Sequence, residues 1–188
     1  WLVTEQNRLY YAAQGKTGFK TLAPVDFTQP VVLDYRNNAW KLQPREHLTA
    51  EGDEPVRFGS TRTAAPEDVG GQVKLATFNV LNYFSTTGVD YVAGGGTCTF
   101  YTDREGAAVT TNECGTPSAS SGNGPRGAAN ADSLARQQAK IVNAINTLDA
   151  DVVSLEEIEN SAKLGKPRDT ALDTLVAALN AEAGAGTW

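Results

Sequence analysis

The sequence predicts a mixed α/β (α+β) fold in two layers, a sheet with covering helices, preceded by a small β segment. The main observation is a change of hydrophobic period: apolar runs typical of strands at residues 73–84 and from Val152 alternate with helical patterns at 131–148 and 168–183. Strands that alternate with helices are typical of a sheet covered by helices. A second observation is that residues 1–42 carry only short apolar and aromatic runs, broken by Pro, Gly and Asn.

Composition limits the classes of function. The chain has 188 residues and a formal net charge of −6, which argues against a clamp that neutralises nucleic-acid phosphates with many Lys and Arg side chains. A phosphate substrate stays possible if a bound metal supplies the positive charge. No apolar run approaches the roughly 18 residues of a membrane span, so we predict none. The chain begins at Trp1 without a Met, and we expect a processed chain or a piece of a longer protein.

The first 42 residues are interpreted as the end of a preceding β domain. In "DYRNNAW", Asn37 and Asn38 lie between two strand-like runs, and Asn tolerates the positive φ that a tight hairpin turn requires. Residues 43–72 are polar and rich in Pro, Gly, Glu and Arg, which predicts a linker.

The second region begins with a strand, residues 73–84, that contains "LATFNVLNYF". Two amides, Asn79 and Asn82, interrupt it, although Asn is a poor strand former. Residues 85–127 are then predicted as a long loop insertion, and insertions of that length are usually functional or mobile. Its cysteines, Cys98 and Cys114, fit no zinc pattern; we expect a disulfide that stabilises the fold by roughly 3 kcal/mol and indicates an oxidising compartment, with two free thiols as the alternative.

Two amphipathic helices and a short strand follow. An apolar stripe at helical spacing predicts the first helix at 131–148, with Asn130 or Asp132 as its cap. A short apolar strand begins at Val152, and the second helix, 168–183, is expected to end at Gly184.

Three acids, Glu156, Glu157 and Glu159, crowd the end of that short strand. In a regular strand alternate side chains share a face, which would place Glu157 with Glu159 and Glu156 with Ile158. Carboxylates so close repel one another unless a cation lies between them. The segment is either a solvated turn or a site where one carboxylate holds a hard cation such as Mg²⁺. An amide on one strand and a carboxylate on the other would suit metal-assisted phosphoester chemistry.

The runs "KLATFNVLNYF", "GPRGA" and "RQQAKIVNAINTLDADVVSLEEIEN" together resemble the opening of the endonuclease/exonuclease/phosphatase superfamily. They are similar, more narrowly, to the secreted bacterial nucleases of that superfamily. The resemblance covers residues 61–188, and it implies the N-terminal part of a catalytic domain, that is, the incomplete first half of a two-sheet sandwich.

The resemblance also implies roles for particular residues. Asn79 matches the active-site asparagine of the first strand, and Glu157 the catalytic, metal-binding glutamate. Glu159 is carried over as a second metal ligand. Asn82, Arg126 and Asn160 match the pattern of the secreted subgroup and are interpreted as substrate-binding, although Asn82 could be a turn residue and Arg126 a surface charge.

The activity implied is hydrolysis of DNA or RNA phosphodiester bonds with a divalent metal, Mg²⁺ first, with Mn²⁺ or Ca²⁺ as alternatives. The later motifs of the superfamily, Gly-Asp-x-Asn and Ser-Asp-His, do not occur in this sequence. We therefore expect the general base and catalytic histidine outside this chain, the remaining C-terminal part of the domain as a partner, and no activity from this chain alone. Another phosphodiester substrate, or a non-catalytic binding or surface module, are the alternatives.

Overall fold

The computed structural model describes residues 23–47, 55–59, 61, 63–103, 105–119 and 122–188. The chain forms two compact units, residues 1–64 and 65–188. The predicted boundaries were a β segment to residue 42, a linker at 43–72 and a catalytic part from 73. Each unit is described by itself.

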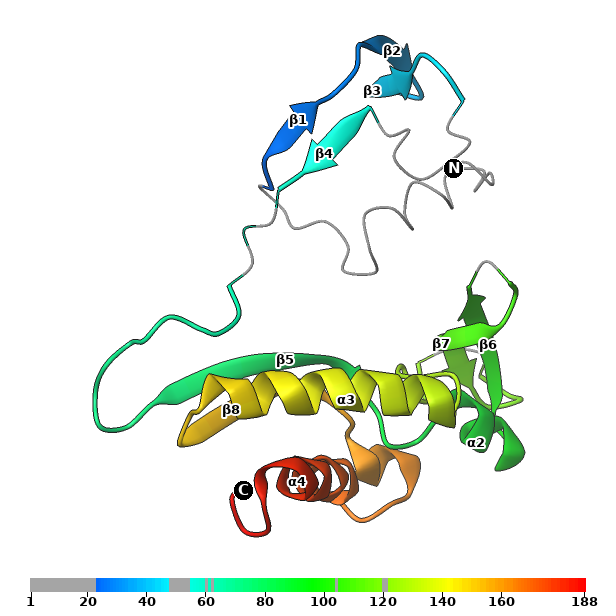
Figure 1. The fold of residues 1–188 in the computed structure, drawn as a ribbon. Coiled ribbons are helices and arrows are strands. Elements are labelled where there is room, and N and C mark those ends of the chain that lie inside the picture. Colours follow the sequence, from blue (N-terminus) through cyan, green and yellow to red (C-terminus); the bar gives the residue numbers. More distant parts are fainter. Residues whose placement is uncertain (1–22, 48–54, 60, 62, 104, 120–121) are drawn as a thin grey trace. The chain divides into compact units, whose positions relative to one another are not determined.

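The described part of the first unit consists of short antiparallel strands (Figure 1). β1 (Val25–Phe27) pairs with β4 (Val56–Phe58), and β2 (Val31–Arg36) pairs with β3 (Ala39–Pro44). The predicted hairpin at Asn37 and Asn38 is confirmed, because both residues have positive φ, 53° and 57°, between β2 and β3. The predicted linker is wrong in part: β3 extends into it and β4 lies within it, because cross-strand pairing with β1 supplies backbone partners that a linker lacks.

The second unit is a βαβα arrangement. β5 (Leu75–Tyr83) and β8 (Val152–Ile158) form a parallel two-stranded sheet, and α3 (Ala131–Leu148) lies between them in the chain. After β8 the chain forms a 3-10 helix, η1 (Ser161–Leu164), and then α4 (Thr170–Ala183). Two parallel strands need a crossover connection, and α3 lies in the connection between β5 and β8. This bears out the mixed α/β prediction.

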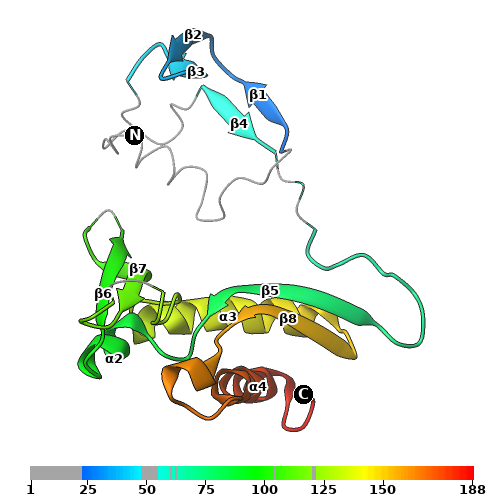
Figure 2. The ribbon, with the colours of Figure 1, turned by 180° about the vertical axis from the view of Figure 1, so that it is seen from behind.

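One face of this sheet is packed and the other is open. The core joins Val80 and Tyr83 of β5 to Ile141, Val142 and Ile145 of α3 and to Leu175 and Leu179 of α4. Figure 2 shows the sheet from the other side, with β5 and β8 in front of α3. On that open face the register pair Leu75 and Val152 is 76% and 56% exposed.

Both helices end close to where the sequence predicts. Asn130 caps α3: its side-chain oxygen accepts a hydrogen bond from Ser133 N at 2.9 Å. α4 begins at Thr170 rather than at residue 168, and Gly184 follows its last residue. No helix in the described ranges has both the length and the apolar character that a membrane crossing demands.

The predicted loop insertion has a structure of its own. It holds α2 (Gly88–Ala93) and an antiparallel hairpin of β6 (Thr97–Thr102) and β7 (Ala108–Gly115). The disulfide is confirmed, and it joins Cys98 to Cys114, which lie opposite each other in the hairpin. The irregular loop was the wrong expectation because Thr-rich segments such as "TCTFYT" favour strands once they are paired.

Candidate functional site

The pairing of β5 with β8 becomes irregular at the same position along both strands. The ladder is regular up to Asn79 opposite Glu156 and resumes with Tyr83 opposite Ile158. In between, Leu81 and Asn82 have φ of 51° and 53° on β5, and Glu157 has φ of 62° on β8. Positive φ is uncommon outside glycine, and such outliers concentrate at functional sites. The carboxyl ends of β5 and β8 are therefore the candidate site.

The irregularity on β8 adds a second exposed acid next to Glu156. Leu155 and Ile158 both pack against the core, whereas a regular strand would point them to opposite faces. The left-handed Glu157 is the additional residue that shifts the alternation, and both Glu156 and Glu157 are exposed. The two acids that regular alternation would place together differ in their surroundings, because Glu157 is exposed and Glu159 is only 4% exposed.

The side chain of Asn79 forms a hydrogen bond with the backbone where β5 becomes irregular. Its side-chain oxygen accepts a hydrogen bond from Leu81 N at 2.8 Å, which closes a turn that ends at the left-handed Leu81. Asn79 is exposed and lies opposite Glu156. Among the described residues its Nδ2 group has no hydrogen-bond partner, so both N–H donors remain for a ligand.

Helix α3 supports the irregular end of β5 through two adjacent glutamines. Gln137 Nε2 donates to Val80 O at 3.2 Å and to Leu81 O at 2.8 Å. Gln138 Oε1 accepts from the hydroxyl of Tyr83 at 2.6 Å. Burial, with a smaller effect of the nearby Glu159 carboxylate, raises the pKa of Tyr83 to about 12.

Sequence reasoning missed both glutamines. The available signal was a polar pair on a helix that otherwise presents an apolar stripe to the core, in the "RQQAK" segment.

Glu159 lies inside a hydrogen-bond network, behind the exposed strand ends. Its carboxylate accepts from Ser85 Oγ at 3.1 Å, from Thr86 N at 2.9 Å and from Ser161 Oγ at 2.6 Å. Its backbone N–H also donates to Tyr83 O at 2.9 Å. The prediction that Glu159 binds metal stays a prediction, and three donors already occupy its oxygens.

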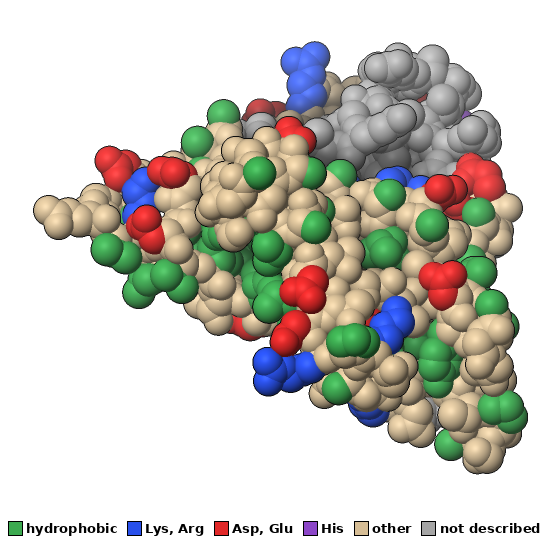
Figure 3. Space-filling view, turned by 90° about the horizontal axis from the view of Figure 1, so that it is seen from below, with side chains coloured by type: hydrophobic (Ala, Val, Ile, Leu, Met, Phe, Trp, Pro, Cys, Tyr) green, Lys and Arg blue, Asp and Glu red, His purple; other side chains and the backbone are tan. Residues whose placement is uncertain are grey.

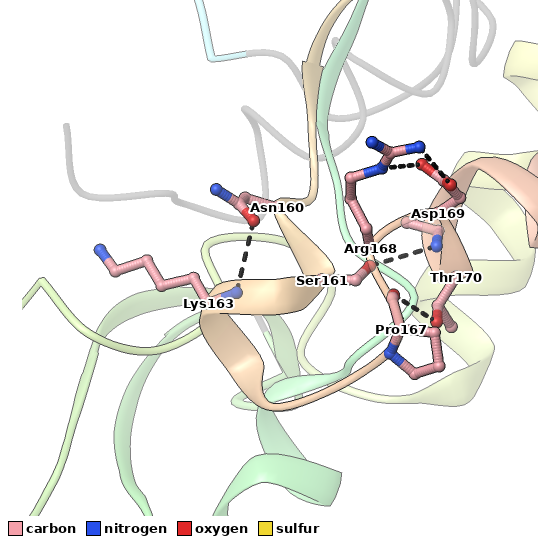
Figure 4. Close-up of polar contacts among 8 residues, drawn as sticks. Asn160, Ser161, Lys163, Pro167, Arg168, Asp169 and Thr170 are labelled. Atoms are coloured by element: carbon pink, nitrogen blue, oxygen red, sulfur yellow. Dashed lines mark hydrogen bonds and ion pairs between the residues drawn. The ribbon is translucent and has the colours of Figure 1, made fainter.

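The predicted substrate-binding residues differ in their surroundings. Asn82 adopts the left-handed conformation of a turn residue. Arg126 is exposed and precedes Gly127, where a Cβ atom would lie only 2.7 Å from Asn82 O, so the "GPRG" segment packs closely against the end of β5. Asn160 is also exposed, but its side chain caps η1 by accepting from Lys163 N at 3.3 Å (Figure 4). A capping role is therefore shown for Asn160.

The exposed acids Glu156 and Glu157 provide a metal with few protein ligands. No group of three or more His, Cys, Asp or Glu side chains within the described part of the chain is placed to hold an ion. Mg²⁺, however, is usually bound through one or two carboxylates together with waters and substrate phosphates. The exposed Glu156 and Glu157 are compatible with that kind of site.

On the face seen in Figure 3, acidic and basic side chains are scattered, and the coloured residues form no basic patch there. Comparison of the chain with protein-family models, with curated proteins and with solved structures found no match.

Proposed function

We propose that the chain is the N-terminal part of the catalytic domain of a secreted, metal-dependent nuclease of the endonuclease/exonuclease/phosphatase superfamily. The observation that carries the proposal is the pairing of Asn79 with Glu156, beside the exposed Glu157, at the point where both strands contain residues of positive φ. Backbone strain of this kind persists where surrounding contacts hold it, and it is typical of sites that orient reacting groups. The sequence resemblance independently points to Asn79 and Glu157.

In this proposal the two residues have complementary tasks. Glu157 holds the metal, with Glu156 next to it. When bound, a divalent cation stabilises the charge that develops on the phosphoryl and leaving oxygens. The Nδ2 group of Asn79 donates to a phosphate oxygen or orients a neighbouring carboxylate, while its Oδ1 stays engaged with Leu81 N.

The remaining groups extend the site. Arg126, on the segment that packs against Asn82, provides positive charge for the substrate backbone. We propose that the general base and the histidine come from the C-terminal part of the longer protein, together with the second sheet of the sandwich. The open face with Leu75 and Val152 is where apolar contacts are available for that part.

Two properties of the chain agree with a secreted nuclease. The disulfide between Cys98 and Cys114 is typical of proteins that fold in an oxidising compartment. The net charge of −6 agrees with phosphate recognition that depends on a metal rather than on a basic surface.

The test compares the full-length gene product with the 188-residue chain on plasmid DNA, single-stranded DNA and RNA, with Mg²⁺, Mn²⁺ or EDTA. We expect metal-dependent cleavage by the full-length protein and none by the chain alone. Glu157→Ala should abolish cleavage, whereas Glu182→Ala, an exposed acid on α4, should leave it unchanged. Absence of cleavage by the folded full-length protein in every metal would contradict the proposal, and hydrolysis of a lipid or sugar phosphodiester instead would change the substrate class.

A further inference from the structure

The buried carboxylate of Glu159 is unusual because it lies in the interior without a basic partner. It is 4% exposed, and among the described residues no Lys or Arg forms an ion pair with it. A buried charge is tolerated when hydrogen bonds satisfy it. Here a backbone N–H and two hydroxyl groups do so, from Thr86, Ser85 and Ser161.

These bonds join the segments that follow β5 and β8, which are distant in sequence. Ser85 and Thr86 follow β5, whereas Glu159 and Ser161 follow β8. Ser161, which is fully buried, also accepts from Ala171 N at 3.2 Å through its Oγ, and Figure 4 shows this bond to the start of α4. The network thus connects both strand ends to the first turn of α4.

We propose that Glu159 is a positioning residue that, with Ser161, holds the exposed carboxylate of Glu157 in place at the strand ends. This inference rests on the proposed function, and it gives Glu159 a role other than metal ligand. Glu157 is left-handed and lies two residues before Glu159 in the chain. A left-handed glutamate needs outside contacts to stay in that conformation. Glu159 supplies them through both its side chain and its backbone bond to Tyr83 O.

A metal ligand and a positioning residue respond oppositely when the metal is removed. Two exposed carboxylates that share a metal repel each other in EDTA, so neutralising one relieves repulsion. Neutralising Glu159 instead weakens hydrogen bonds that exist without metal. In EDTA, Glu159→Gln should therefore lower the unfolding temperature, whereas Glu157→Gln should leave it unchanged or raise it.

The experiment uses the full-length gene product with Glu159→Gln, Ser161→Ala, Glu157→Gln and the control Glu182→Gln. Amide hydrogen exchange in EDTA follows Thr86 N–H and Ala171 N–H, and Mn²⁺ affinity is titrated well below the unfolding temperature. For Glu159→Gln we expect exchange at Thr86 at least about tenfold faster and Mn²⁺ affinity about 10- to 100-fold weaker. Ser161→Ala keeps two of the three bonds to Glu159, and it should speed exchange mainly at Ala171.

Three results would contradict the inference. If Glu159→Gln leaves Thr86 exchange unchanged or raises the unfolding temperature in EDTA, the network does not hold the strand ends. If Glu159→Gln unfolds more easily but keeps wild-type Mn²⁺ affinity while Glu157→Gln loses it, Glu159 is only structural. If Glu157→Gln retains both Mn²⁺ affinity and cleavage, the proposed function itself fails, and with it the role of Glu159 towards Glu157.

Discussion

Asn79 of β5 lies directly opposite Glu156 of β8, and the regular ladder of the parallel sheet stops at this pair. Beyond it β5 inserts three residues where β8 inserts one, and both insertions contain left-handed residues. Asn79 and Glu156 reach the open face by the regular alternation of the strands, whereas the exposure of Glu157 accompanies the irregularity on β8. This explains why a core strand contains an asparagine: its oxygen closes the turn that begins there.

Two substitutions at Asn79 should separate its structural task from its proposed chemical one. Asn79→Asp keeps an oxygen that accepts from Leu81 N, so stability should change by less than about 1 kcal/mol. Asn79→Ala loses that bond and should destabilise by roughly 0.5–1.5 kcal/mol. Both variants lose the Nδ2 donor, so both should lose cleavage by the full-length protein, by about 100-fold or more. Urea denaturation and cleavage rates provide the two measurements, and full activity in Asn79→Asp would argue against Nδ2 as a ligand donor.

The left-handed conformation of Leu81 should lower the free energy of unfolding. Leu81→Gly removes the steric penalty at φ of 51°, and little packing is lost because the side chain is 74% exposed. We expect stabilisation by roughly 0.5–1 kcal/mol.

Leu75→Gly is the matched control for that substitution, with the same residue type, strand and exposure but in the regular part of the ladder. It should destabilise by roughly 0.5–1 kcal/mol, because glycine weakens a regular strand. Chemical denaturation of both variants gives the comparison. Equal losses of stability would mean that Leu81 is not strained in solution.

Stability should fall at alkaline pH because of Tyr83. Its pKa is raised to about 12 by burial and by the Glu159 carboxylate, whereas an unfolded tyrosine titrates near pH 10. The neutral phenol therefore contributes stability in full below about pH 10, and this contribution is lost as the pH rises towards 12. Tyr83→Phe should flatten the loss between pH 10 and 12. Denaturation across that range, beside ultraviolet titration of the tyrosines, measures it; a tyrosinate signal from Tyr83 near pH 10 would contradict it.

The disulfide should stabilise the β6–β7 hairpin more than the sheet. Cys98→Ser/Cys114→Ser should lower the free energy of unfolding by roughly 3 kcal/mol, as expected for a loop of this length. Amides of β6 and β7 should lose exchange protection first, while those of β5 and β8 keep theirs. Hydrogen exchange before and after reduction gives the measurement, and uniform loss of protection over the second unit would show that the hairpin is not an independent part.

Local patterns determined much of this protein. The apolar stripe from Leu134 to Leu148 sets the bounds of α3, because helical periodicity and an Asn130 cap are short-range signals. Asn37 and Asn38 fix a tight hairpin for the same reason, since their tolerance of positive φ is a property of the residue itself. The cysteine pair likewise indicated its own bond.

Tertiary structure decided the site. Nothing in Leu81 or Glu157 favours positive φ; contacts from distant segments, such as the bonds from Gln137 to β5 and from Glu159 to the chain after β5, accompany it. An argument from alternating side chains assumes a regular strand, and the left-handed Glu157 interrupts that alternation on β8. One left-handed residue shifts the phase of every side chain after it. The sequence by itself therefore determined α3, α4, β5, β8 and the hairpin at Asn37 and Asn38, because their signals are short-range. The positive φ of Leu81 and Glu157 and the burial of Glu159 accompany contacts between distant segments, so only the tertiary structure decided them.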